Sequence, residues 1–173
     1  HSVPRRRCSD LCSPYGDRIR WRRFTPNGAT AEIYTMDLNG NDKRRVTHVG
    51  ARSWAPYYHP SGDYIIFTNN SLGFANFELF IVGTNAKHEP VRVTFTEGFD
   101  GLPVFSPNGK QLAWTSNRTS EKRSQLFVAD WDDAAARELL HHPLVSSRNQ
   151  QYTDAPAFAS TVSEISADDI EQH

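Results

Sequence analysis

The sequence predicts an all-β chain of repeated four-stranded antiparallel units, the blades of an incomplete β-propeller. Three observations support this: a proline–glycine turn that recurs at a fixed spacing, apolar segments that recur in step with it, and few long helical patterns. The chain has 173 residues, of which 38% are hydrophobic and 12% are aromatic, with ten Gly and ten Pro. This composition is typical of a folded domain rich in turns.

The turn sequence occurs three times, as CSPYGDRI (12–19), YHPSGDYI (58–65) and FSPNGKQL (105–112). Its prolines are separated by 46 and 47 residues. Proline fixes φ and glycine supplies a positive φ, so a Ser-Pro-x-Gly sequence favours a tight turn. Each copy therefore predicts two strands joined by a short connection.

Two further elements keep the same register. The first is AEIYTMD (31–37), FELFIVG (77–83) and SQLFVAD (124–130); the second is RRVTH (44–48), VRVTF (91–95) and RELLH (137–141). A period in the forties made of short strands is the signature of propeller blades. We therefore expect about three blades plus one strand, which is too few to close a ring.

Each copy is expected to contain four strands. In the last full copy these are Leu102–Ser106, Gln111–Ser116, Gln125–Asp130 and Arg137–His141, with a polar loop at 117–124. In the middle copy, YIIFT (64–68) is apolar at consecutive positions, which is typical of a strand buried on both faces.

A fourth copy begins at YTDAPAFAS (152–160), which matches GFDGLPVFS (98–106) and predicts the first strand of another blade. Ser166 followed by Asp169 resembles a capping box and predicts the start of a helix. We therefore divide the chain into an irregular basic segment (1–11), the blades (12–160), and a linker with the start of a helix that leads to a further domain (161–173).

Arginine replaces small residues in the first copy. Arg20, Arg22 and Arg23 stand where the third copy has Ala113, Thr115 and Ser116. A buried arginine is costly unless it is paired, so either this face is exposed or residues 1–25 are not native to the fold. With the arginines at 5, 6, 7 and 18 they form a basic cluster, which we interpret as a solvated end rather than an anion-binding groove.

The motif FSPNGKQLAWTSNR (105–118) followed by LFVAD (126–130), and AEIYTMDLNG (31–40) followed by RRVTH (44–48), resemble the TolB-like β-propeller repeat. The resemblance covers about residues 12–160. It implies a propeller of usually six four-stranded blades, a periplasmic or secreted location, and a docking role in the bacterial cell envelope. Such repeats also stand beside peptidase domains, and ISADDIEQH (165–173) resembles the start of a zinc aminopeptidase domain.

The expected function is therefore a non-catalytic scaffold that binds a protein or peptide partner. The alternative is an accessory propeller that gates or orients an attached hydrolase, a peptidase. The sequence contains no nucleophile elbow, phosphate-binding loop or paired-carboxylate signature, so we expect no catalytic residues. Self-association through open blade edges is a further expectation.

We expect no cofactor, metal, nucleic-acid partner or membrane insertion. The net charge is −1, and no apolar run reaches the ~18 residues of a membrane helix. Cys8 and Cys12 form a single C-x₃-C, which we interpret as two incidental thiols rather than a zinc site or a bridge.

Asp100 and Arg118 are the predicted binding residues. Asp100 lies in the loop before a first strand, which in a propeller opens near the central channel, and Arg118 follows a second strand. The alternative is structural: Asp100 caps its own turn, and Arg118 pairs with it or with a neighbouring blade.

Overall fold

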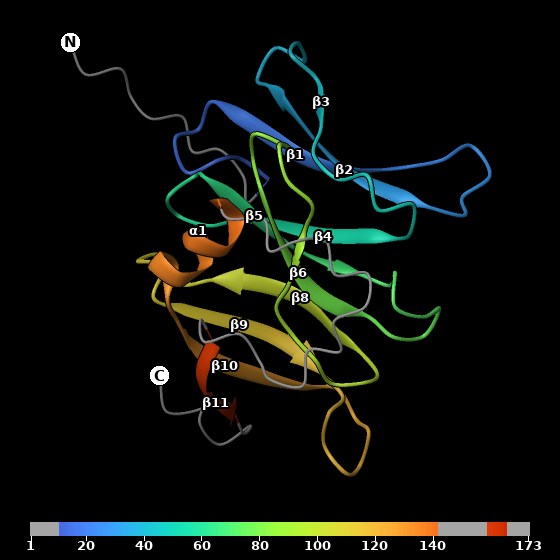
Figure 1. The fold of residues 1–173 in the computed structure, drawn as a ribbon, viewed down its shortest axis with the longest axis vertical. Helices are drawn as coiled ribbons and strands as arrows, with labels where there is room; N and C mark the ends of the chain where they lie inside the picture. The colour runs from blue at the N-terminus through green and yellow to red at the C-terminus, as the bar shows by residue number, and fades with distance from the viewer. Residues whose placement is uncertain (1–10, 142–158, 166–173) are drawn as a thin grey trace.

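The computed structural model describes residues 11–141 and 159–165 and contains three antiparallel sheets. Figure 1 shows these sheets stacked along the long axis of the molecule, with the N-terminal sheet at the top. The sheets are blades of a propeller, so the predicted fold class is confirmed. The blades follow one another in chain order, as the repeat requires.

The first blade has three strands, β1 (Arg18–Phe24), β2 (Ala31–Asp37) and β3 (Arg44–Arg45), in the order β1-β2-β3. Its β1 carries the strand-two sequence of the repeat. An isolated bridge between Cys12 and Ile19 stands where the other blades have their first strand. Cys12 is disulfide-bonded, so the interpretation of the cysteines as incidental thiols is wrong.

The second blade is complete, with β4 (Ser53–Tyr58), β5 (Tyr64–Asn69), β6 (Glu78–Gly83) and β7 (Val91–Arg92) in sequence order. All six residues of β5 are buried, because this strand has a neighbouring sheet on each face. The apolar run at 64–68 therefore has the predicted place in the fold.

The third blade contains β8 (Asp100–Phe105), β9 (Gln111–Ser116), β10 (Gln125–Trp131) and β11 (Ala159–Ile165), in the order β11-β10-β9-β8. The helix α1 (Asp133–His141) stands in the chain between β10 and β11. It lies at the left of Figure 1, beside the turns that join the first and second strands.

The predicted fourth strand at 137–141 is wrong, because these residues belong to α1. The segment DDAAARELL is rich in helix-forming residues. Asp132 accepts a hydrogen bond from the backbone N–H of Ala135 at 3.0 Å and so caps the helix. Ala136 and Leu140 are buried and join the core between the second and third blades.

Residues 159 and 160, at the end of the predicted fourth copy, lie in the third blade instead. Residues 159–165 pair antiparallel with β10 and complete the third blade, and they cross the expected domain boundary at 160. Pairing with β10 satisfies the backbone groups of its free edge. Residues 152–158 and the predicted helix start at Ser166 lie outside the described residues.

Equivalent aromatic pairs confirm the register of the repeat. The second and third strands of the three blades align Trp21 with Tyr34, Phe67 with Phe80, and Trp114 with Phe127. Their ring centroids are 5.6, 6.0 and 5.9 Å apart. The same cross-strand contact therefore holds each blade at the same place.

The core lies between the blades. One cluster joins the first and second blades through Ile33, Ile65 and Phe67, and a larger one joins the second and third through Leu79, Trp114 and α1. Arg20 is also buried, and its guanidinium donates hydrogen bonds to the carbonyls of Cys12 and Pro56. These bonds offset the cost of burying the charge, so β1 forms part of the blade.

The far face of the third blade is exposed. Leu126 is 37% exposed, whereas its counterparts Ile33 and Leu79 are fully buried against a following blade. Leu102 and Val104 on β8 are 48% and 43% exposed. Leu126 therefore presents to solvent an apolar side chain whose counterparts are covered by a neighbouring sheet in the other two blades.

We expect Trp114→Ala to lower the free energy of unfolding by about 3–5 kcal/mol, the usual cost of removing a buried large aromatic side chain. Trp21 has the equivalent position but is only half-buried. Trp21→Ala is the matched control and should cost clearly less. Denaturant unfolding measures both, and equal losses would mean that the blades do not bury this position as described.

We also expect the chain to self-associate, because water contact with apolar surface costs roughly 25 cal/mol per Å². Lysine at positions 102 and 126 together should lower the association measured by light scattering at micromolar concentration. Leu38→Lys, at an exposed turn position, is the control. A monodisperse wild-type monomer would contradict this expectation.

Candidate functional site

The two predicted site residues form an ion pair inside the third blade. The Asp100 carboxylate is fully buried and accepts hydrogen bonds from Arg118 Nη2, at 3.1 Å to each oxygen, and from Trp114 Nε1 at 3.2 Å. The Arg118 guanidinium lies 5.1 Å from the ring centroids of Trp114 and Phe127. The structure thus brings the pair together, with the carboxylate closed to solvent and the guanidinium partly accessible.

The first and second blades each contain a buried glutamate that was not predicted from the sequence. In the second blade, Glu78 accepts hydrogen bonds from Arg92 at 2.6 Å and from the Thr94 hydroxyl at 2.5 Å. The same hydroxyl accepts a hydrogen bond from the backbone N–H of Leu79. This clamp ties the third strand to the segment that includes the fourth.

The first blade repeats the clamp with Glu32, Arg45 and Thr47, joined by the same bonds. In the first two blades the sequence has a glutamate near the start of the third strand of the repeat and an Arg-x-Thr at the fourth. This recurring pattern could have identified the clamp from the sequence. The third blade has Gln125 at the glutamate position, and RELLH supplies no Arg-x-Thr. The clamp is therefore lost in the blade where α1 replaces the expected strand.

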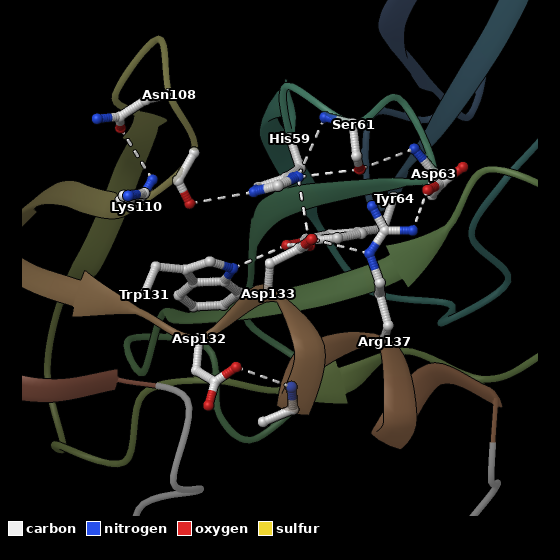
Figure 2. Close-up of polar contacts among 12 residues, drawn as sticks. His59, Ser61, Asp63, Tyr64, Asn108, Lys110, Trp131, Asp132, Asp133 and Arg137 are labelled. Atoms are coloured by element: carbon white, nitrogen blue, oxygen red, sulfur yellow. Dashed lines mark hydrogen bonds and ion pairs between the residues drawn. The ribbon is translucent and has the colours of Figure 1, made fainter.

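A polar network joins the second and third blades at the end of the sheets that carries the proline–glycine turns, the turn end (Figure 2). The Asp133 carboxylate accepts hydrogen bonds from the Tyr64 hydroxyl at 2.8 Å and from Arg137 Nε at 2.9 Å. Trp131 Nε1 donates to the Tyr64 hydroxyl at 2.7 Å. Arg137 also pairs with Asp63, so α1 is fixed to the second blade by charge as well as by packing.

His59 is buried in this network between the two turns. Its ring stacks on Tyr64 with centroids 4.5 Å apart, and Nε2 lies 3.2 Å from the carbonyl oxygen of Gly109. A Cβ at Gly109 would lie 2.6 Å from that nitrogen, and φ there is +70°. Glycine is thus required at this turn both for backbone conformation and for the close approach of His59.

Ser61, His59 and Asp133 lie together but do not have the geometry of a catalytic triad. Ser61 Oγ and Asp133 Oδ1 both face His59 Nδ1, at 2.9 and 3.5 Å, whereas a triad places the serine and the carboxylate on opposite ring nitrogens. Burial also lowers the pKa of His59. This arrangement fits a contact that joins two blades better than an activated nucleophile.

The opposite end of the sheets, where the first and third strands begin, carries a group of aromatic rings, the aromatic end. Trp54 meets Phe77 and Phe99 edge-on, each with a centroid distance of 6.4 Å. Phe77 and Phe99 are 5.8 Å apart and also form a parallel bridge between the second and third blades. The backbone N–H of Asp100 donates to the carbonyl of Phe77, so the Asp100–Arg118 pair lies directly beside these rings.

A hollow of about 210 Å³ opens at the aromatic end between the first and second blades. Its lining includes Arg22 and Phe24 from the first blade and Arg52, Trp54 and Phe77 from the second. The Arg22 guanidinium lies 5.2 Å from the Phe24 ring centroid and 5.6 Å from that of Trp54. Arginines and aromatic rings of separate blades thus meet at one accessible place.

Two exposed aromatic side chains, Phe24 and Phe74, lie at this hollow. Phe74 is 80% exposed and lies 5.6 Å from the Arg52 guanidinium, and Phe24 is 48% exposed. Leu72 in the same loop as Phe74 is 50% exposed. Tryptophan and arginine are the side chains most enriched where proteins bind one another.

Within residues 11–141 and 159–165, no group of three or more His, Cys, Asp or Glu side chains could hold a metal ion. Over the same residues, no helix is long and apolar enough to span a bilayer.

The described residues form three blades of a propeller, with polar contacts between the blades and an accessible aromatic end. Residues 7–165 match the family model described as the TolB beta propeller domain. The chain belongs to this family. The match includes β11, in agreement with its place in the third blade.

Solved structures of other proteins have a similar fold. The chain is similar to the TolB of Acinetobacter baumannii, with 25% identity and a TM-score of 0.58 over 69% of this chain and 28% of that one. It is also similar to an Agrobacterium tumefaciens protein assigned as TolB, with 22% identity and a TM-score of 0.60 over 69% of this chain and 43% of that one.

A curated relative carries the name of an enzyme. The dipeptidyl-peptidase 5 of Porphyromonas gingivalis is 27% identical over 111 residues, which cover 64% of this chain. The matched part is 16% of that relative's length. The likeness therefore concerns a small share of the peptidase.

The buried Glu78 carboxylate generates a prediction on pH. Burial raises its pKa from 4.5 to about 7, although the hydrogen bonds from Thr94 and Arg92 oppose this. Between these two values the folded state holds a proton that the unfolded chain has released. The contribution of Glu78 to stability therefore falls as pH rises from about 4.5 to about 7.

We expect the free energy of unfolding of Glu78→Gln, relative to that of wild type, to increase by roughly 1–3 kcal/mol between pH 5 and pH 8. The amide keeps the shape of the side chain and does not ionise. Glu121→Gln, at an exposed position, controls for the loss of one carboxylate. A Glu78→Gln difference that stays constant with pH would contradict the assignment.

Proposed function

We propose that this chain is a non-catalytic propeller scaffold that binds a protein or peptide partner at its aromatic end. The observation that carries the proposal is the surface of exposed aromatic and arginine side chains around the hollow. A hollow of about 210 Å³ is smaller than the ~300–1,000 Å³ typical of small-molecule sites. It suits one side chain of a larger partner.

In this proposal Asp100 and Arg118 serve binding by holding the surface in place. The carboxylate fixes the start of β8 to the segment after β9. Because Asp100 also pairs through its backbone with Phe77, this fixes the two phenylalanine rings that support Trp54. The partly accessible Arg118 is the member of the pair that a partner could touch.

We place the protein in the periplasm or outside the cell. The disulfide at Cys12 supports this location, because disulfides persist in oxidising compartments. Resemblance to TolB-like propellers of the cell envelope supports it as well.

A second candidate is an accessory propeller that gates or orients an attached peptidase. The relative named dipeptidyl-peptidase 5 favours this candidate. Sequencing of the complete open reading frame tests this candidate. A domain in the same chain that carries the metal ligands or the nucleophile of a peptidase supports it, and a reading frame without such a domain contradicts it.

Selection of a random peptide library on the immobilised chain tests the scaffold proposal. We expect wild type to enrich peptides that fail to bind when Phe24 and Phe74 are both replaced by alanine. Both rings are exposed, so their removal should leave the fold intact. Leu38→Ala, at an exposed turn position away from the aromatic end, is the matched control and should keep the selected peptides.

The proposal fails if no peptide is enriched above the bare support. It also fails if the double variant retains every selected peptide. Circular dichroism of each variant separates loss of binding from loss of fold.

A further inference from the structure

We propose that the hollow at the aromatic end binds an acidic peptide segment, with one apolar side chain seated on Trp54 and neighbouring carboxylates paired with Arg22 and Arg52. This inference rests on the proposed function and specifies the chemistry of the partner. Three observations carry it: the pairing state of the arginines, the origin of the hollow, and the charge of its lining.

The arginines of the described chain divide into two groups. Seven form ion pairs with carboxylates: Arg18, Arg44, Arg45, Arg92, Arg118, Arg123 and Arg137. Among the remaining described arginines, Arg20 bonds to backbone carbonyls, while Arg22, Arg23 and Arg52 lie over aromatic rings and have no ion pair. Two of these last three line the hollow.

Stacking leaves an arginine ready to bind an anion. A guanidinium that packs its flat face on a ring keeps its edge N–H groups for a carboxylate, in a bidentate geometry. The ring also limits the orientations of the side chain, so less entropy is lost on binding. The Arg52 side chain makes one hydrogen bond, from Nε to the carbonyl of Ala29 at 3.3 Å, which leaves its terminal nitrogens available.

The repeat explains why the hollow exists between these blades. A parallel bridge joins Ala31 to Arg52 between the first and second blades, and the equivalent bridge joins Phe77 to Phe99 between the second and third. The two phenylalanine rings pack together and fill the second junction. The small side chain of Ala31 leaves the first junction open, with the partly buried Trp54 and Phe77 lining it.

The lining selects for negative charge. Its seven residues are Arg22, Phe24, Ala31, Arg52, Ser53, Trp54 and Phe77, of which two are basic and none is acidic. A single-stranded nucleic acid would also suit aromatic rings and arginines, but it needs a basic groove that follows several phosphates. The net charge of −1 and the small size of the hollow favour a peptide.

Synthetic peptides labelled with fluorescein test the inference by fluorescence anisotropy. The probe is Asp-Glu-Trp-Glu-Asp; Asn-Gln-Trp-Gln-Asn lacks its charge, and Asp-Glu-Ala-Glu-Asp lacks its ring. We expect the first to bind at least about tenfold more tightly than either of the others, because charged hydrogen bonds and ring burial both contribute. Binding of the acidic probe should weaken as salt is raised.

Charge reversal identifies the arginines. Arg22→Glu and Arg52→Glu should each weaken binding of the acidic probe by about tenfold or more. Arg22→Lys keeps the charge without the flat fork and should restore part of the affinity. Arg123→Glu reverses an exposed arginine outside the hollow and should leave binding unchanged. If Arg52→Glu disturbs folding, Arg22→Gln gives the same comparison at a more exposed position.

The outcomes separate this inference from the proposed function. Selected library peptides that bind at the aromatic end with no preference for acidic residues, or that tolerate both charge reversals, overturn the inference and leave the scaffold proposal standing. Absence of any selected peptide overturns both. An oligo(dT) strand that binds more tightly than the acidic probe, and loses affinity in Arg22→Glu, overturns the peptide assignment in favour of nucleic acid.

Discussion

Burial of side chains between successive sheets is the constraint on which this structure depends. A blade with neighbours on both sides, such as the second, presents one face to the blade before it and the other to the blade after it, so its middle strands have little contact with water. The complete burial of β5 is one result of this geometry, and the contrast between buried Ile33 and Leu79 and exposed Leu126 is another. Because apolar area is the main source of stability here, the number of neighbours a blade has decides how stable it is.

Buried charge has a separate role within each blade. The clamps at Glu32 and Glu78 each join a third strand to the segment that follows it, and Asp100 joins a first strand to the segment after the second. A buried carboxylate must be paired to be tolerated, so each clamp permits few alternative positions for the segments it joins. Where the third blade lacks the glutamate, its strand order is kept but a capped helix stands in the connection.

Variation between equivalent positions creates an accessible hollow lined by aromatic rings and arginines. Ala31 and Phe77 have the same place in successive blades, yet one leaves a hollow and the other fills it. The turn end shows the converse, since His59, Tyr64 and Asp133 fill the junction between two blades with hydrogen bonds and stacked rings. A repeat therefore supplies a uniform frame, and departures from it supply a candidate binding surface.

The sequence alone determined the class of fold, the period and the register of the repeat, because these depend on local turn chemistry and on apolar patterning. It could not predict α1, because the repeat favoured a strand at 137–141. The helix forms there instead because the third blade lacks the Glu and Arg-x-Thr of the clamp and because Ala136 and Leu140 are buried against the neighbouring blade. The sequence also led to the interpretation of Arg22 as part of a solvated basic end. Only the tertiary structure brings Trp54 of the next blade beside it, because Arg22 and Trp54 are more than 30 positions apart in the sequence and no local pattern connects them.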